Sequence, residues 1–148
     1  MAYCKTILNV INADLEVLSL RHTNKWLIKV RIIFMLDKTL FERINDREIP
    51  ADIIYEDEVC FAIKDINPQA PIHILLIPIK PIKKLSECEE VDKDILAHLF
   101  ITVGKIAEKL GIPDNFRVNI NNGKEAGQEV FHLHIHILGG RKFNWPPG

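Results

Sequence analysis

The sequence contains little cysteine, almost no net charge and no long hydrophobic run free of charged residues. Its three cysteines, Cys4, Cys60 and Cys88, are scattered and form neither a CxxC motif nor a paired Cys-His spacing. An odd number of isolated cysteines is typical of reduced thiols in a cytosol-like compartment. None has a histidine beside it in the sequence, so we predict buried or surface thiols rather than nucleophiles.

The charged residues almost cancel, with 19 basic and 20 acidic side chains and a formal net charge of −1. Such a chain has no global attraction for nucleic acid or for a membrane surface, so any phosphate must be bound by local groups. Charges interrupt each apolar run before it reaches the length of a membrane span, and no clean secretory signal is present. We therefore expect a small-molecule partner, with no nucleic acid and no membrane partner.

Residues 1–34 differ in character from the rest, because basic residues outnumber acidic ones there. The basic residues are Lys5, Arg21, Lys25, Lys29 and Arg31, and the acidic ones are Asp14 and Glu16. We predict that residues 1–34 are an N-terminal extension outside the core, or sequence upstream of a true start at Met35, and that residues 35–148 form the domain. The expected location is cytoplasmic or nuclear, or mitochondrial if residues 1–34 are a presequence.

The rest of the chain has the periodicities of one mixed domain, which suits a chain of 148 residues. Apolar spacing predicts two helices, over 37–44 and 91–110. Strands are predicted at 53–55, 60–63, 73–78, 116–120 and 130–138, the first two joined by an acidic turn. Strands, one long helix and then two more strands predict an antiparallel α+β domain.

Three of the six histidines, His132, His134 and His136, stand at every second position of the apolar segment 130–138. This period predicts a strand with three imidazoles on one face and Phe131, Leu133, Ile135 and Ile137 on the other. Imidazole, with a pKa of about 6.5, can attack, accept a proton or donate one near neutral pH, so we favour catalysis. A solvated strand and a zinc site are the alternatives, but structural zinc needs four ligands and no paired motif supplies the rest.

The run His132–Leu138 fits the histidine-triad pattern, in which histidine and an apolar residue alternate three times. Further matching segments are Asp65–His73, Ile77–Pro78, Gly127–Gln128 and 139–148. From about Thr39 to its end, the chain resembles the histidine-triad (HIT) family, and its Hint branch of nucleotide-binding proteins in particular. The resemblance implies a HIT-like fold, with a five-stranded antiparallel sheet, one long and one short helix, and a homodimer that joins two sheets.

The resemblance also implies an enzyme, a purine nucleoside phosphoramidase that releases a nucleoside monophosphate through a nucleotidyl-histidine intermediate. His134 would attack phosphorus, with its second ring nitrogen held by the backbone carbonyl of His132. His136 would assist the phosphate oxygens or the leaving group. His73 would lie beside the triad and support His132. Neither a metal nor a cofactor is expected.

The family pattern assigns the purine base to an apolar cleft, although a plain core would use the same residue types. The cleft residues are Leu40, Phe41, Ile44, Ile63 and Ile66. Asp65 would accept hydrogen bonds from the ribose hydroxyls, or would instead cap the proline-rich turn that follows it.

The phosphate contacts implied by the family fall on Asn121, Gly127 and Gln128, although both polar side chains could instead satisfy turn backbone. Glu129 stands where animal Hint proteins carry a serine that touches the phosphate, and a carboxylate there would repel an anion unless it points away or binds the amine part of the substrate. Trp145, near the C-terminus, is expected to dock on something, and the family pattern places it on the leaving-group side across the dimer interface.

Two other functions remain open. The chain could hydrolyse dinucleoside polyphosphates, as another branch of the family does, although the ending 145–148 resembles Hint proteins. It could also be a nucleotide-binding regulatory protein for which catalysis is incidental.

Overall fold

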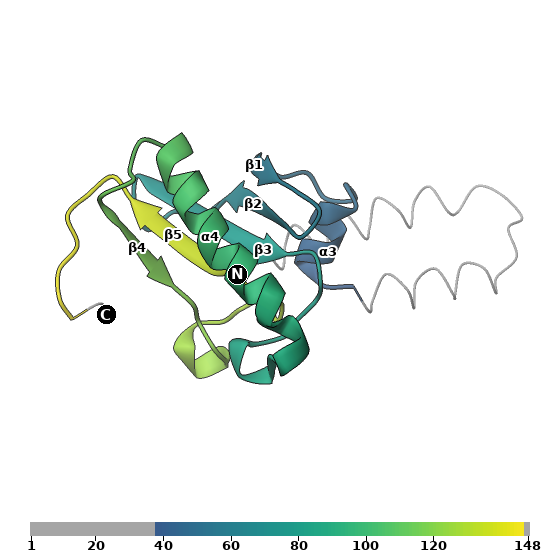
Figure 1. The fold of residues 1–148 in the computed structure, drawn as a ribbon. Coiled ribbons are helices and arrows are strands. Elements are labelled where there is room, and N and C mark those ends of the chain that lie inside the picture. Colours follow the sequence, from purple (N-terminus) through teal and green to yellow (C-terminus); the bar gives the residue numbers. More distant parts are fainter. Residues whose placement is uncertain (1–37, 147–148) are drawn as a thin grey trace, which may run out of the picture. The chain divides into compact units, whose positions relative to one another are not determined.

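The computed structural model describes residues 38–146, so the predictions for residues 1–34 and for a start at Met35 lie outside the described residues. Within them, five strands form one antiparallel sheet in the order β1-β2-β3-β5-β4. The strands are β1 (Ile53–Glu56), β2 (Cys60–Lys64), β3 (Ile72–Pro78), β4 (Phe116–Asn119) and β5 (Ile135–Gly139). The long helix α4 (Lys93–Lys109) covers one face, and the short helix α3 (Leu40–Asn45) packs on the other (Figure 1). The predicted antiparallel α+β fold is confirmed.

Local signals explain why the helices start later than predicted. Helix α3 begins after Thr39, whose extended backbone and side chain form a capping box with Glu42. Helix α4 begins at Lys93, because Glu90–Asp92 form a 3₁₀ turn first. Gly111, with a φ of 72°, follows the end of α4 and adopts the left-handed conformation that stops a helix.

The histidine-bearing strand is shorter than the predicted 130–138. Strand β5 starts at Ile135, so His132 and His134 precede it and only His136 lies within it. Phe131 is also predicted wrongly, because its side chain is 46% exposed instead of sharing the buried face.

Both neighbours of β5 explain its late start. Pairing with β3 begins at Ile135, and pairing with β4 begins at His136. Among residues 38–146, no strand offers a ladder of hydrogen bonds upstream of these positions, and the Leu133 amide donates instead to the carbonyl oxygen of Ile82 at 2.6 Å. The triad therefore begins in the segment before β5 and ends inside the strand, so the three histidines do not lie along one strand face.

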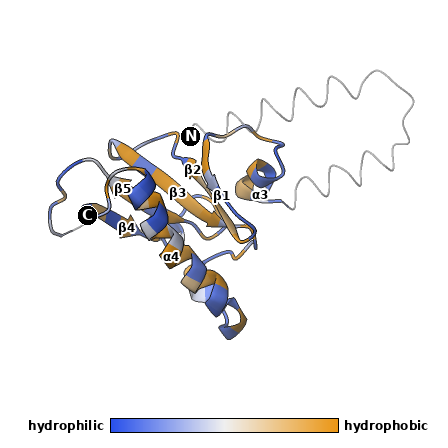
Figure 2. Ribbon diagram, turned by 45° about the horizontal axis from the view of Figure 1, so that its top comes forward, coloured by the Kyte–Doolittle hydropathy of each residue, from blue (hydrophilic) through white to orange (hydrophobic). Residues whose placement is uncertain are grey.

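The sheet separates two hydrophobic clusters. The larger lies between the sheet and α4, and the smaller lies on the α3 side. Alternate residues of β3 serve the two clusters: Ile74 and Leu76 belong to the larger, Leu75 and Ile77 to the smaller. Figure 2 shows β3 as hydrophobic along most of its length, as expected for a strand buried on both faces. No helix within residues 38–146 has the length and hydrophobicity needed to cross a bilayer.

Candidate active site

The triad rings gather beside the smaller cluster, on the α3 side of the sheet. The Phe41 ring meets the rings of His132 and His134 edge-on, with centroids 5.7 and 5.2 Å apart. The His134 and His136 rings are 5.0 Å apart. The three imidazoles thus lie near the start of β5, although only His136 belongs to the strand.

His134 is held in one tautomer by the backbone. Its Nδ1 lies 2.7 Å from the carbonyl oxygen of His132, which is the contact the family pattern implies. A carbonyl oxygen can only accept, so Nδ1 carries the proton and Nε2 keeps its lone pair. Burial lowers the pKa of His134 below its usual 6.5, which keeps the ring neutral near pH 7. Nε2 of His134 therefore meets the requirements for a nucleophile.

A second chain of hydrogen bonds sets the tautomers of His73 and His136. The backbone amide of Gln69 donates to Nδ1 of His73 at 3.1 Å, so Nε2 of His73 carries the proton. That Nε2 lies 2.9 Å from Nδ1 of His136, which must accept. Nε2 of His136 is therefore a donor, and it has no hydrogen-bond partner among the described residues although it is buried. An unpaired buried donor at this point suits an anionic ligand.

The structure corrects the predicted role of His73, which contacts His136 and not His132. The register of β3 against β5 explains this result, because His73 pairs with Leu138 and Leu75 with His136. His73 and His136 are thus diagonal neighbours on one face, within reach of each other's rings. His132 precedes β5 and lies beyond this ladder.

His132 is buried and engaged at both ring nitrogens. Its Nε2 donates to the carbonyl oxygen of Pro78 at 2.8 Å, and its Nδ1 accepts from the hydroxyl of Thr39 at 2.8 Å. His132 is therefore a positioning residue that fixes the carbonyl to which His134 donates. Thr39 is not among the predicted site residues: its capping box marks a helix start, but nothing in that motif signals a contact with a residue 93 positions away.

Asp65 caps the turn, the second of its two predicted roles. Its Oδ1 accepts from the amide of Asn67 at 2.8 Å. Its Oδ2 lies 3.4 Å from Nε2 of His73 and is close enough to the histidine cluster to face a ligand. Asp65, His73 and His136 also place one ligand atom each within 4.8 Å of one another, so these residues could hold a metal ion.

Four of the five predicted base-cleft residues lie together. Phe41, Ile44 and Ile63 are buried in the smaller cluster, and Leu40 packs against it. Ile66 is not part of this cluster, and 65% of its surface is exposed. The four clustered residues pack in the protein interior next to the triad, whereas Ile66 is exposed to solvent, where a ligand can contact it.

The polar side chains of the loop before the triad bind backbone groups, both in that loop and in the segment around Lys83. Gln128 is buried, with Oε1 accepting from the amide of Gly123 and Nε2 donating to the carbonyls of Lys83 and Val130. All three of these hydrogen bonds go to backbone groups, which is the alternative predicted for it.

Three further phosphate candidates lie in the same loop. Asn121 Nδ2 donates to the carbonyl of Gly127 at 3.2 Å, so it also holds turn backbone. Gly127 has a φ of 84°, in the left-handed region that favours glycine. Glu129 is exposed.

Trp145 does not dock on the described part of this chain, because 85% of its surface is exposed. The tail just before it is anchored instead. The Phe143 ring lies under the guanidinium groups of Arg117 and Arg141, at 4.8 and 4.3 Å, and Arg117 donates to the carbonyl of Asn144. Trp145 thus projects from a held segment.

Comparisons with known proteins place this geometry in context. Residues 46–143 match the HIT domain family. A HIT-like protein of Synechocystis is 57% identical over 114 residues, which cover 77% of this chain and all of the relative. A Zea mays protein named 14 kDa zinc-binding protein is 46% identical over 112 residues, covering 74% of this chain and 88% of that protein.

Solved structures agree. A HIT family hydrolase from Legionella pneumophila has a TM-score of 0.73 and 41% identity, covering 75% of this chain and all of that one. A histidine triad nucleotide-binding protein from Candida albicans has a TM-score of 0.64 and 28% identity, covering 75% of this chain and 85% of that one. The chain therefore belongs to the HIT domain family of hydrolases and nucleotide-binding proteins.

Proposed function

We propose that this chain is a purine nucleoside phosphoramidase, which cleaves the P–N bond of adenosine or guanosine 5′-phosphoramidates and of aminoacyl-nucleotide adducts. The observation that carries the proposal is the hydrogen bond from Nδ1 of His134 to the carbonyl of His132. It leaves Nε2 of His134 as an unprotonated nitrogen next to a buried donor, Nε2 of His136. A nucleophile beside a donor is the arrangement that displacement at an anionic phosphorus requires.

In the first step, Nε2 of His134 forms a bond to phosphorus while the P–N bond breaks. The leaving amine takes a proton from Nε2 of His136 in its imidazolium form. That form gains its second proton, on Nδ1, from solvent when the substrate binds, and the Nε2 proton of His73 then turns from Nδ1 of His136 toward Oδ2 of Asp65, 3.4 Å away. Burial lowers the pKa of His136 to about 4 in the empty site, and the phosphate anion opposes this shift by favouring the imidazolium. The products are a nucleotidyl-His134 intermediate, a free amine and neutral His136.

In the second step, water attacks the phosphorus of the intermediate. His136 accepts the proton of that water, the bond between phosphorus and His134 breaks, and the nucleoside monophosphate leaves. Both histidines return to their starting protonation states. These two reaction steps, as proposed, need neither a metal nor a cofactor.

The nucleotide would be held by the apolar residues around α3 and by Asp65. Leu40, Phe41, Ile44 and Ile63 offer an apolar wall for the base, with Ile66 closing on it from outside, and such walls discriminate weakly between adenine and guanine. Oδ2 of Asp65 is the acceptor we assign to the ribose hydroxyls. Glu129 is assigned to the amine part of the substrate, since a carboxylate repels the phosphate.

We further propose that the protein works as a homodimer in which Trp145 approaches the leaving group bound by the partner. The exposure of Trp145 on a held tail supports this assignment. A cytoplasmic location is supported by the free thiols of Cys60 and Cys88.

The test is turnover of adenosine 5′-monophosphoramidate against a diadenosine polyphosphate by the purified full chain. We expect AMP and ammonia from the first, at a kcat/KM at least tenfold above that for the second. The reverse ranking would assign the chain to dinucleoside polyphosphate hydrolysis, whose phosphate leaving group needs no proton. Nucleotide binding without turnover of either would support a regulatory role.

Treatment with a chelator tests whether the reaction depends on a metal ion. The Zea mays relative is named for zinc binding, and zinc at Asp65, His73 and His136 would occupy the proposed proton donor. We expect an unchanged rate after EDTA treatment. A lost rate that Zn²⁺ restores would replace imidazole attack by a metal-dependent reaction.

A further inference from the structure

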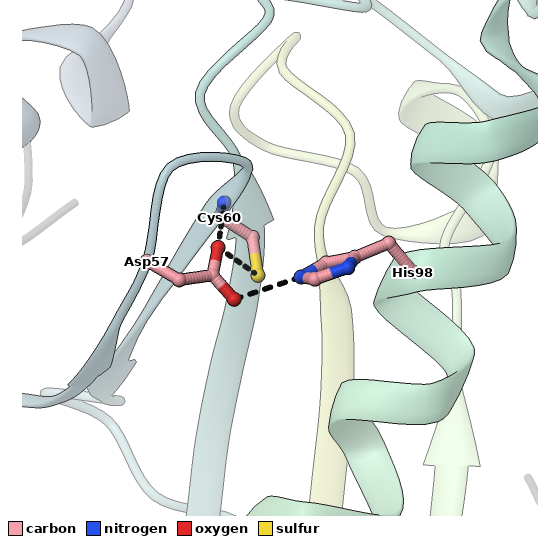
Figure 3. Close-up of side chains that lie close together, drawn as sticks. All are labelled: Asp57, Cys60 and His98. Atoms are coloured by element: carbon pink, nitrogen blue, oxygen red, sulfur yellow. Dashed lines mark hydrogen bonds and ion pairs between the residues drawn. The ribbon is translucent and has the colours of Figure 1, made fainter.

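A second cluster of reactive side chains lies on the opposite face of the sheet from the triad. It consists of Asp57 in the turn between β1 and β2, Cys60 at the start of β2, and His98 in α4 (Figure 3). Cys60 belongs to the larger cluster under α4, whereas the triad adjoins the smaller one. Hydrolysis as proposed above uses none of these three residues.

The three side chains converge on one point. Oδ2 of Asp57 lies 2.7 Å from Nε2 of His98, and Oδ1 lies 3.5 Å from the Cys60 sulfur. One ligand atom from each residue lies within 4.8 Å of the other two. Ligand atoms that share a tetrahedral ion at about 2.0–2.3 Å each lie roughly 3.3–3.8 Å apart, so these side chains need only small shifts to share one ion.

Hydrogen bonds from backbone amides already orient the Asp57 carboxylate. Oδ1 of Asp57 accepts from the backbone amides of Val59 and Cys60 at 2.8 and 2.9 Å, and this leaves Oδ2 directed at His98. Ligating carboxylates in metal sites are usually held by such outer hydrogen bonds. The turn itself therefore supplies a rigid ligand.

A buried hydroxyl beside the cluster lacks a partner. Thr102 lies one helical turn after His98, it is fully buried, and no described group lies at hydrogen-bonding geometry from its Oγ1. Its Oγ1 lies near the Cys60 thiol and the Tyr55 hydroxyl without reaching hydrogen-bonding geometry with either. A buried polar atom without a partner beside three ligand types indicates a site that takes a polar occupant.

We propose that Asp57, Cys60 and His98 form a zinc site that ties helix α4 to the β1–β2 turn. A thiolate and an imidazole favour Zn²⁺ over Mg²⁺ or Ca²⁺, which prefer oxygen ligands alone. The side chains of Asp57 and His98 are 25% and 31% exposed, so a water molecule can complete a tetrahedral set from the open side.

Binding would exchange existing contacts for metal bonds. The hydrogen bond between His98 and Asp57 breaks, and the His98 ring exchanges its Nε2 proton for one on Nδ1 through solvent, so that Nε2 can bind Zn²⁺. The Cys60 thiol gives its proton to solvent as the sulfur joins the ion. Burial raises the pKa of that thiol to about 12, so the free sulfur is protonated and unreactive without an ion. The Tyr55 hydroxyl, which donates to Oδ2 at 2.8 Å, stays as an outer partner.

The experiment is a titration of the chelator-stripped full chain with Co²⁺, followed by competition with Zn²⁺. We expect one equivalent to bind with a thiolate-to-cobalt absorption band, which only a cysteine ligand produces, and Zn²⁺ to displace it. Cys60→Ser should abolish the band, while Cys4→Ser and Cys88→Ser keep it as matched controls. His98→Gln, at a partly exposed position, should fold normally and weaken the affinity at least tenfold.

Triad variants separate this site from the cluster of Asp65, His73 and His136. His136→Gln should leave the absorption band and the cobalt affinity unchanged. Zn²⁺ should raise the thermal midpoint of the parent and of His136→Gln, but not that of His98→Gln. The proposal is overturned if no thiolate band forms, if the band survives Cys60→Ser, or if His136→Gln rather than His98→Gln removes binding.

Discussion

The chemistry of single residues in the active site depends on which ring nitrogen carries each proton. Two backbone groups decide this: the carbonyl of His132 for His134, and the amide of Gln69 for His73 and, through it, His136. These contacts give adjacent histidines opposite abilities, a lone pair on one and a donor on the other. Identical side chains therefore have separate predicted roles.

His134→Ala should abolish hydrolysis while nucleotide binding survives, because the proposed base and ribose contacts lie on other segments. A loss of at least three decades in kcat corresponds to about 4 kcal/mol of transition-state stabilisation. Steady-state kinetics with adenosine 5′-monophosphoramidate measures the loss, and His98→Gln serves as a control outside the active site. Activity within tenfold of the parent would remove His134 from the role of nucleophile.

The pH dependence of kcat/KM should show a shifted acid limb. The reactive form of His134 is the neutral ring, and burial lowers its pKa, so protonation competes only at a pH below the usual 6.5. We expect the acid limb of kcat/KM, which reports His134, to lie below pH 6.5, and kcat/KM also to decline toward pH 8 because the leaving amine needs a protonated His136. An acid limb centred above 6.5, measured in buffers of constant ionic strength, would mean that another group limits the reaction.

Among the secondary-structure elements, the short helix α3 links folding to the site. Thr39 caps the helix by accepting from the amide of Glu42, and the same hydroxyl donates to Nδ1 of His132. The start of the helix and the placement of the triad thus share one oxygen atom. The late start of β5 has a similar effect, since it frees the carbonyl of His132 to accept from an imidazole and not from a strand.

Thr39→Val should weaken both functions of that oxygen. Loss of the cap should lower the free energy of unfolding by about 1 kcal/mol, and a displaced His132 carbonyl should lower kcat by roughly tenfold or more with little change in KM. Thr39→Ser keeps the hydroxyl and should restore both quantities. If Thr39→Val loses stability while kcat stays at the parent value, the contact with His132 has a structural role alone.

For the whole molecule, residues 1–34 and the C-terminal tail raise separate questions. All the proposed site residues follow Met35, and the matching family region covers residues 46–143. A chain that starts at Met35 should therefore keep the rate and the thermal midpoint of the parent. Aggregation or loss of most activity would show that residues 1–34 contribute to the domain.

The C-terminal tail should influence which leaving group is preferred. Trp145 is exposed on a segment held by Arg117, so its large apolar surface is available to a second copy of the chain. Trp145→Ala and truncation after Arg141 should both leave a folded dimer by light scattering, yet change the ranking of phosphoramidates with bulky and small amines. Phe143→Ala tests the anchor alone. Equal losses for every amine, or none, would contradict a selectivity role.

Local patterns in the sequence determined the elements and the identity of the triad. The apolar spacing of α4 and the residues that stop it act over a few positions, where chain geometry leaves little freedom. The period of two in His132–His136 identified the triad but not the start of β5. Only the tertiary structure decided the partners: His73 contacts His136 because of the β3–β5 register, Thr39 reaches His132, and His98 reaches Asp57 and Cys60. Such contacts join residues that are far apart along the chain, and their distances depend on strand register and helix docking. Strand register and helix docking are set by the burial of the whole core and not by any local period in the sequence.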